Sequence, residues 1–544
     1  MKKNSKGITL VALVITIIIL LILAGITIIS LSGDNGLFTR SQQAKNKTLE
    51  EQEKEQIAMN GYQEEIEKQL NNTNTPPTDI DTDDTESDPV TSTGEWNDTK
   101  KVNSPELMEG MTGVYWDDSG NEIKVTNSNI YNWYNYDQQK WANAKTKDGS
   151  YWVWIPRYAY QIESGCYTRT AGKISIKFLQ GKTNKDSDGN EISTQYPSVL
   201  NGKMSNFVVH PSFTNGKTNY YRNGEWDSEI TGYWVAKYIA GFQECTQTIE
   251  SDGTISEPVI DTNNIKYSDK NYTKAPGSTN KLNAISQTLD KLPLMSYPVF
   301  KPLTYVYNCI TIGDIYTLSQ EIAQASNFYG LNSTKTDSHQ MKNSEWGAVA
   351  YLTQSEYGRD GEEITINSKK LSDPDSKHLL GVSGYANSNA NDVSASTTNN
   401  KSGIFDLSGC AFEYTSAYIS NGDSNIKYYG SSFANINAST TGYRTLSTKY
   451  ATVYPYDSNK TGAAYNNVKS TTYGFGDAIL ETSFRNYGPY SWYQDDSYFP
   501  YLTTPFFVRG GSLAYSYRSG AFAFDYDLGS SDSAKSFRTV LTSL

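Results

Sequence analysis

The residues that most often perform chemistry in proteins are few and scattered in this 544-residue chain. The complete set of cysteines and histidines is Cys166, Cys245, Cys309, Cys410, His210, His339 and His378. The cysteines have no CxxC spacing, and the histidines form no cluster with metal-ligand spacing. No H-E-x-x-H or G-x-S-x-G motif is present. We therefore predict no catalytic residue, no metal and no other cofactor, and cysteines that are buried thiols or form one disulfide.

Composition limits the classes of partner. The net charge is −12, the isoelectric point is about 5.0, and Lys and Arg together number 47. This balance excludes a nucleic-acid partner, which a basic surface would bind. Tyrosine is abundant, with 42 copies, and Trp adds 10. Such a composition fits either an exported binding protein that uses Tyr for contacts or a β-rich fold that uses aromatic side chains in its strands.

The N-terminus has the pattern of a membrane anchor. Lys2, Lys3 and Lys6 precede an apolar run over 8–31 that has no charge in 24 residues. A helix of this length spans about 36 Å, enough for a hydrocarbon core. The lysines predict a cytoplasmic N-terminus and a single pass, with the rest of the chain outside the cell membrane. Membrane lipid is then a partner.

The junction of Gly7 and Ile8 resembles the processing site of type IV prepilins and pseudopilins, and the resemblance covers about the first 30 residues. It implies that a prepilin peptidase cuts between Gly7 and Ile8 and that the new N-terminus is methylated. The family usually has Glu as fifth mature residue, where this chain has Ala12. Residues 1–7 are therefore either a cleaved leader or the cytoplasmic tip of an uncleaved anchor.

Two segments separate the anchor from the bulk of the chain. Residues 32–70 predict a stalk helix, because Glu, Gln and Lys dominate and Tyr62, Ile66 and Leu70 recur every four residues. This helix is either pilin-like or a solvated spacer. Residues 71–99 carry eight acids and no Lys or Arg, a composition typical of disorder. We assign 71–101 to an acidic linker.

Residues 102–544 read as one elaborated domain. Runs such as 151–158 and 232–239 are short and aromatic, which predicts strands. Residues 313–328 and 342–352 predict helices, the second capped by Asn343 or Ser344. Arg509 and Arg538 are forked donors suited to buried carboxylates such as Asp406 or Glu413.

Six segments, in order, resemble the formylglycine-generating-enzyme (sulfatase-modifying factor) branch of the C-type lectin fold. They are 151–158, 210–238, 343–352, 403–415 (which resembles "GLYDMSGNVWEWT"), 507–512 ("RGGSW") and 536–541 ("GFRVV"). The resemblance implies an α+β fold class, in which an N-terminal transmembrane helix and stalk precede a C-type-lectin-like domain. The family's enzymes use paired cysteines in and after the RGGSW region, and 505–544 contains none. No catalytic residue is carried over.

The segment 509–538 resembles the variable region of noncatalytic C-type lectin proteins that diversity-generating retroelements mutate at template adenines. Glycines 510, 511, 520 and 529 and Arg509 and Arg538 look like a fixed frame. The resemblance implies that ligand binding falls to the residues between them: Leu513, Ala514, Tyr515, Ser516, Tyr517, Asp525, Tyr526, Asp527, Ser530, Ser531, Asp532 and Ser533. Residues 513–534 contain no Trp, Met, Gln or Glu, which mutated Asn codons cannot encode. The alternative is an ordinary closing hairpin with polar loops.

These observations predict a membrane-anchored, extracellular recognition or adhesion protein that binds an unidentified protein or carbohydrate. Tyr supplies rigid contact area, and Ser and Asp supply adaptable hydrogen bonds. The first alternative is a minor type IV pilin or pseudopilin at a filament tip, with pilin subunits as partners. A formylglycine-generating type of enzyme is the second. Lectin-like loops often bind calcium through Asp and carbonyl oxygens, but no compact motif assigns such a site here.

Overall fold

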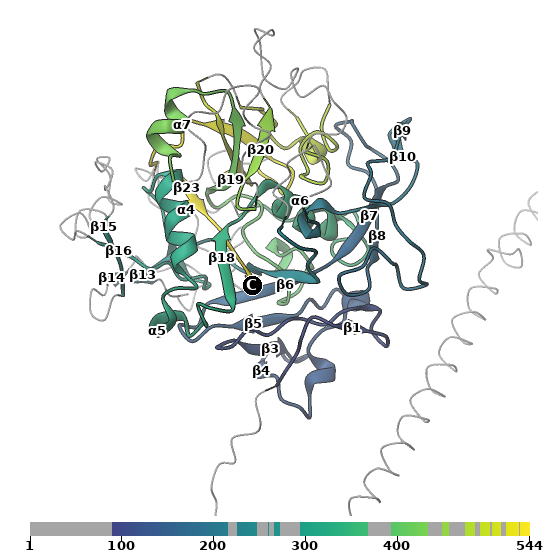
Figure 1. Cartoon of the computed structure of the whole chain (residues 1–544), viewed down its shortest axis with the longest axis horizontal. Coiled ribbons are helices and arrows are strands. Elements are labelled where there is room, and N and C mark those ends of the chain that lie inside the picture. The colour runs from purple at the N-terminus through teal and green to yellow at the C-terminus, as the bar shows by residue number, and fades with distance from the viewer. Residues whose placement is uncertain are drawn as a thin grey trace, which may run out of the picture. The chain divides into compact units, whose positions relative to one another are not determined.

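The computed structural model describes residues 90–215, 226–246, 248, 259–260, 266–271, 294–367, 393–432, 449–455, 474–484, 490–500, 503–512, 518–532 and 534–544. The chain divides into two compact units, Met1–Glu86 and Ser87–Leu544. All the described residues belong to the second unit. Its strands and helices are arranged around a buried centre, with the C-terminus beside β18 (Figure 1).

The largest sheet in the described residues has seven strands in the order β18, β24, β12, β6, β5, β3, β4. Their bounds are Thr336–Gln340, Thr539–Ser543, Gly232–Ala236, Tyr151–Pro156, Asn143–Lys145, Thr112–Trp116 and Glu122–Lys124. β6 and β12 are built from aromatic and β-branched residues, which suit the centre of a sheet. Trp154 and Trp234 lie opposite each other in register with ring centroids 5.3 Å apart. The strands predicted over 151–158 and 232–239 are confirmed.

A second sheet carries the C-terminal residues. It contains β20 (Thr452–Pro455), β19 (Phe412–Ser420), β21 (Phe506–Arg509) and β22 (Phe524–Asp527), and β23 (Lys535–Phe537) also pairs with β19. β19 is buried along its whole length. β20 and β23 run parallel to β19, whereas β21 runs antiparallel to it. This sheet therefore joins segments that are far apart in the sequence.

Smaller sheets and short helices complete the described part of the unit. The remaining strands are β1 (Trp96–Asn97), β2 (Val102–Asn103), β7 (Tyr158–Ile162), β8 (Ile174–Phe178), β9 (Val199–Leu200), β10 (Lys203–Met204), β11 (Val208–Val209), β13 (Gly241–Thr246), β14 (Val259–Ile260), β15 (Tyr267–Asn271), β16 (Leu294–Ser296) and β17 (Thr304–Val306). The short helices are η1 (Ile130–Asn132), η2 (Tyr136–Gln138), η3 (Pro211–Phe213), η4 (Val393–Ala395), η7 (Trp492–Gln494), α5 (Ser326–Tyr329) and α7 (Ser424–Tyr429).

Two longer helices pack against the sheets. α4 (Ile312–Glu321) begins after Thr311, whose hydroxyl accepts from the Asp314 N–H, and it packs on β18. α6 (Asn343–Gln354) is buried along its length. Its cap is Lys342 rather than the predicted Asn343 or Ser344, because the Glu345 side chain accepts from the Lys342 N–H at 2.9 Å. Both predicted helices exist, although the first ends earlier and is followed by α5.

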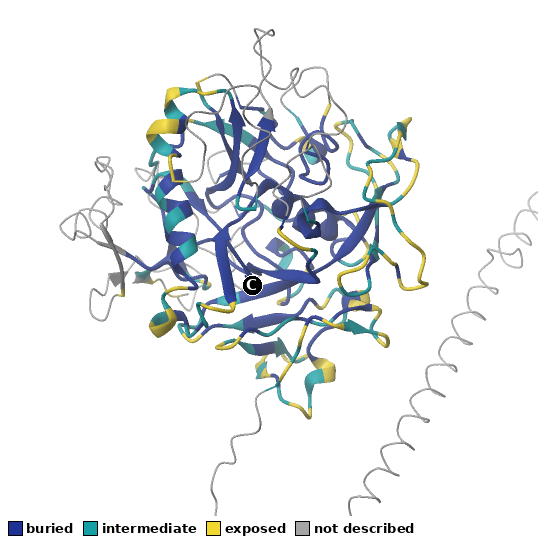
Figure 2. Ribbon diagram, in the orientation of Figure 1, coloured by how far each residue is buried: buried dark blue, intermediate teal, exposed yellow. Residues whose placement is uncertain are grey.

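Burial follows the sheets and α6, whereas exposed residues gather on turns, on the outer side of α7 and around β9 and β10 (Figure 2). The core is rich in tryptophan. Side chains less than 2 % exposed include Trp133, Trp141, Trp152, Trp154, Trp234, Trp346 and Trp492. The abundant aromatic residues are therefore largely core and strand residues.

The structure corrects the predicted fold class. The regular elements of the described residues are mostly β-strands with few helices, rather than those of the predicted α+β fold with a transmembrane helix and stalk. The reason is that the apolar runs are short. Glycine, asparagine and aspartate interrupt them after a few residues, and runs of this length favour strands.

The predicted location is corrected as well. No described helix has the length and apolar character that crossing a bilayer needs, and the longest, α6, has only 12 residues. The spans predicted for the anchor (8–31) and the stalk (32–70) lie outside the described residues. The segment predicted as linker (71–101) overlaps the second unit, because β1 pairs with β2.

A buried ion pair joins the two largest sheets. The Arg538 guanidinium binds both carboxylate oxygens of Glu413 at 2.8 and 3.1 Å. It also donates to the carbonyl oxygens of Ala236 and Phe405 at 2.6 and 2.8 Å. Arg538 lies between β23 in one sheet and β24 in the other, and both partners are at most 1 % exposed. Of the two carboxylates predicted as candidate partners, Asp406 and Glu413, Arg538 pairs with Glu413.

Replacing Arg538 by Met should therefore destabilise the protein strongly, because it leaves the Glu413 carboxylate buried without a counter-charge. We expect a loss of about 3–5 kcal/mol in the free energy of unfolding, measured by urea denaturation. Lys335→Met is the control, because its pair with Glu109 is exposed and should contribute about 1 kcal/mol or less. Equal stability of the two variants would contradict this role for Arg538.

Candidate functional site

The strand β22 holds three of the six described residues of the predicted ligand-binding set. It pairs antiparallel with β21, so that Asp525 faces Val508 and Tyr526 faces Phe507. Phe524 is buried in the core, whereas Asp525, Tyr526 and Asp527 are half-buried. Ser530, Ser531 and Asp532 follow in the loop toward β23. Leu513, Ala514, Tyr515, Ser516, Tyr517 and Ser533 lie outside the described residues, as do Gly7 and Ile8.

The frame that precedes β22 is close-packed. Gly511 has a φ of +73°, and a side chain there would collide with Ser519. Arg509 is fully buried, but it does not pair with Asp406 or Glu413 as predicted. It donates to the carbonyl oxygens of Asp477, Ala478 and Ala523 at 2.9–3.0 Å. Arg509 thus fixes β21 against 477–478 through backbone contacts.

A segment that the sequence did not single out lies beside β22. The Tyr498 N–H donates to the Phe524 carbonyl oxygen at 2.9 Å, and the Phe524 N–H donates to the Asp496 carbonyl oxygen at 2.9 Å. The rings of Tyr498 and Tyr526 meet edge to face with centroids 6.3 Å apart. We name Asp496, Tyr498, Arg518, Asp525 and Tyr526 the β22 surface. Only β-sheet pairing brings these residues together, and no local sequence pattern indicates it.

The β22 surface contains two carboxylates in unusual surroundings. Asp496 is 2 % exposed, and within the described residues neither of its carboxylate oxygens has a hydrogen-bond partner. Arg518 Nη1 lies 3.7 Å from Asp496 Oδ1. Burial raises the pKa of Asp496 to about 6, against the opposing charge of Arg518. Burial also raises the pKa of Asp525 to about 7, although the Tyr526 N–H opposes it.

Two other residues of the predicted ligand-binding set stabilise the loop between β22 and β23. Asp527 pairs with Lys535, accepts from the Tyr414 hydroxyl and accepts from the Gly529 N–H at 2.8 Å. Asp532 accepts from the Ala534 N–H at 2.7 Å. Their oxygens are engaged in shaping the turn between β22 and β23. Asp525 and Tyr526 are therefore the better placed of the described residues for binding.

The described histidines are built into the core. Burial lowers the pKa of His210 to about 3, which keeps its ring neutral. The ring nitrogens of His339 lie 3.1 Å from Asp337 Oδ1 and 3.0 Å from Glu345 Oε1. Among the described residues, no three His, Cys, Asp or Glu side chains gather as metal ligands. The lack of a catalytic centre and of a cofactor stays a prediction.

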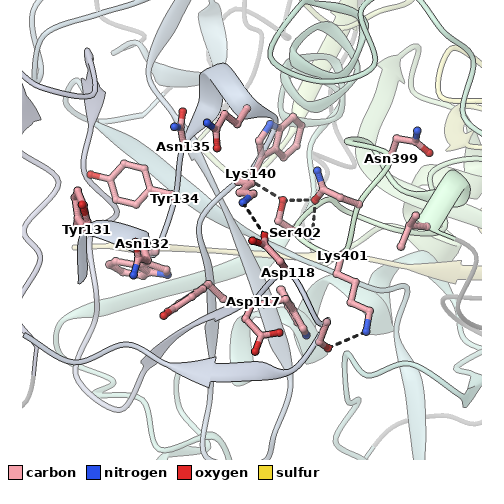
Figure 3. Close-up of a pocket in the computed structure, with 18 residues that line it drawn as sticks. Asp117, Asp118, Tyr131, Asn132, Tyr134, Asn135, Lys140, Asn399, Lys401 and Ser402 are labelled. Atoms are coloured by element: carbon pink, nitrogen blue, oxygen red, sulfur yellow. Dashed lines mark hydrogen bonds and ion pairs between the residues drawn. The ribbon is translucent and has the colours of Figure 1, made fainter. Parts of the chain in front are cut away.

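A cavity of about 710 Å³ lies elsewhere in the second unit, and the sequence did not predict it. Its walls come from 115–120, from 131–141 with η1 and η2, and from 393–402 (Figure 3). A second cavity of about 540 Å³ is lined by 91–104 and by 130–134. Tyr131, Trp133 and Tyr134 line both cavities, so η1 and the residues after it form a ridge between them.

No protein-family model matches the sequence, and no curated protein matches it significantly.

The carboxylates of the β22 surface should make stability depend on pH. Their raised pKa values mean that the folded state holds protons that the unfolded state releases, so these groups lower stability as pH rises from about 4 to about 7. Asp496→Asn combined with Asp525→Asn should remove this loss. We expect the double variant to melt at a higher temperature than the parent. This difference in melting temperature should be larger at pH 8 than at pH 4.

Asp118→Asn is the control for the loss of a carboxylate, because that side chain is fully exposed. A melting-temperature difference between parent and double variant that is the same at both pH values would show that Asp496 and Asp525 titrate normally.

Proposed function

We propose that this chain is a noncatalytic recognition protein that binds its ligand at the β22 surface. One observation carries the proposal: two predicted binding residues, Asp525 and Tyr526, adjoin a second tyrosine, Tyr498, and a buried carboxylate with no hydrogen-bond partner in the described residues, Asp496. Side chains from two separate segments thus form one surface.

The chemistry of this surface suits binding. Tyr498 and Tyr526 offer rigid rings with a polar end, which give contact area at low entropic cost. The half-buried Asp525 carboxylate can accept hydrogen bonds from a ligand, and the buried Asp496 carboxylate adds negative charge to the same surface, which favours a ligand with positive charge. We infer that the ligand is a polypeptide segment that contains Lys or Arg.

The resemblance to noncatalytic C-type lectin proteins of the formylglycine-generating type belongs to this proposal. In its support, β21 and the two strands around Arg538 occur in the order that the resemblance implies, and Gly511 is required by close backbone approach. A binding role without catalysis also agrees with the lack of cysteine in 505–544.

Diversification of the segment 509–538 can be tested by sequencing the DNA around the gene. If template adenines were mutated to vary this region, the genome should carry a near-copy of the 3′ end of the gene beside a reverse-transcriptase gene. The differences between the two copies should fall at adenines of the template. A genome with no such copy would refute diversification but would leave the binding proposal intact.

The binding proposal predicts which peptides the full chain captures. A random peptide library displayed on phage and selected at neutral pH should yield peptides enriched in Lys and Arg. Tyr498→Ala and Tyr526→Ala should each weaken the binding of a selected peptide about tenfold or more, measured by titration calorimetry. Binding should also strengthen from about pH 5 to about pH 8, as Asp496 and Asp525 ionise.

Tyr428→Ala is the matched control, because this tyrosine is 78 % exposed on α7 and lies outside the β22 surface. Circular dichroism would verify that each variant is folded. Selected peptides that bind both tyrosine variants as tightly as the parent would place the binding surface elsewhere and reject the proposal.

A further inference from the structure

We propose that the two cavities on either side of η1 form one cleft that binds a neutral oligosaccharide. We name this the η1 cleft and define it by 91–104, 115–120, 130–141 and 393–402. The inference is independent of the β22 surface, because it rests on different residues and a different ligand. Four observations support it: shape, exposed aromatic rings, unengaged amides and balanced charge.

The shape suits an extended ligand. The larger cavity, about 710 Å³, falls within the roughly 300–1,000 Å³ of small-molecule sites. The second cavity adds about 540 Å³ across the shared ridge of Tyr131, Trp133 and Tyr134. A ligand that fills both cavities must pass over this ridge. A chain of sugar rings can do so, with one group of rings on each side.

The ridge is held in place before any ligand arrives. Lys100 Nζ donates to the carbonyl oxygens of Tyr131 and Tyr134 at 2.8 and 2.6 Å. The same ammonium lies 3.9 Å from the centre of the Tyr134 ring. Trp133 is buried below, where its Nε1 donates to the Asn143 carbonyl oxygen at 2.8 Å. A preorganised wall reduces the entropic cost of binding.

Aromatic rings face the cleft from the ridge and from the end of β3. Tyr131 is 65 % exposed at the rim, an unusual state for a large ring. Trp116 is half-buried, stacked on Tyr151 at 6.1 Å, with Lys237 Nζ 4.2 Å from its ring centre. The electron-rich face of the exposed Tyr131 ring can attract the weakly positive C–H groups on the flat side of a pyranose. The rings therefore suit a sugar as well as an apolar ligand.

Four side chains with primary amides line the larger cavity, and they distinguish a sugar ligand from an apolar one. In the part of the chain that the structure describes, the side chains of Asn132, Asn135, Gln138 and Asn399 make no hydrogen bond. Figure 3 places Asn132 and Asn135 on one side of the view and Asn399 on the other. Each amide offers a donor and an acceptor, as a sugar hydroxyl does. An apolar ligand would leave these amides without partners.

The charges of the larger cavity are satisfied internally. Asp117 accepts from the Asn121 backbone and side chain at 2.8 and 3.0 Å. Asp118 lies 3.7 Å from Lys140 Nζ, and Lys401 Nζ donates to the Gly120 carbonyl oxygen at 3.0 Å. The two acids balance the two lysines. Because both lysines among the described residues that line this cavity are already engaged, an uncharged saccharide is favoured over a phosphate, sulfate or carboxylate ligand.

The experiment is an array of glycans, probed with the full chain and followed by titration calorimetry with the best neutral oligosaccharide. Neutral oligosaccharides should bind, sulfated and sialylated ones should not bind better, and affinity should change little between low and high salt. Tyr131→Ala and Gln138→Ala should each weaken binding about tenfold. Tyr131→Phe should retain most of the affinity, because it keeps the ring.

Matched controls separate the cleft from the rest of the surface. Tyr428→Ala and Gln195→Ala replace exposed residues outside the cleft and should bind as the parent does. Tyr526→Ala should also bind the saccharide normally, which distinguishes failure here from failure of the β22 surface. The proposal is overturned if no neutral glycan binds, if only anionic glycans or peptides occupy the cleft, or if Tyr131→Ala and Gln138→Ala bind like the parent.

Discussion

The Arg538 side chain lies where the polypeptide leaves one sheet and enters the other. β23 pairs with β19, β24 pairs with β12 and β18, and Arg538 is the residue between them. Its five-donor group binds the Glu413 carboxylate and the carbonyl oxygens of Ala236 and Phe405. If the two sheets moved apart, the Glu413 carboxylate would be buried without the Arg538 charge, which is unfavourable. The ion pair therefore holds the two sheets in one relative arrangement. Because β21 and β22 extend the sheet that contains β19, the position of the β22 surface depends on this junction.

Arg509 performs a related task with different partners. It is buried beneath the Trp346 ring, and its donors reach backbone carbonyl oxygens on 477–478 and 523. Burial lowers the pKa of Arg509 to about 10, which still leaves the side chain charged at neutral pH. Carbonyl oxygens of two segments therefore converge on one cation. The turn that follows β21 is fixed at its base, while the residues of the β22 surface remain at the sheet's edge.

These two arginines show how far the sequence could predict the structure. The sequence predicted that Arg538 pairs with a buried carboxylate such as Asp406 or Glu413, because a buried guanidinium needs a counter-charge, and the structure shows that the partner is Glu413. The partners of Arg509 were not predictable, since every residue has a carbonyl oxygen and sequence cannot indicate which ones converge. The strands around Trp154 and Trp234 and the helix α6 followed from local runs of residue types. Tyr498 and the η1 cleft did not, because they depend on contacts such as that of Asn400 with Gln139, 261 residues apart.

The location of the aromatic side chains determines what the unusual tyrosine and tryptophan content means. Composition alone fitted both a binding surface and a strand-rich core, and the seven fully buried tryptophans favour the core. Abundance is therefore no argument for recognition. The informative rings are those that remain exposed or lie at an edge: Tyr131 on a ridge that Lys100 holds, and Tyr526 against Tyr498 beside an unsatisfied carboxylate. At both sites the ring lies beside polar side chains that make no hydrogen bond within the described residues, and this combination, rather than the number of aromatic residues, indicates recognition.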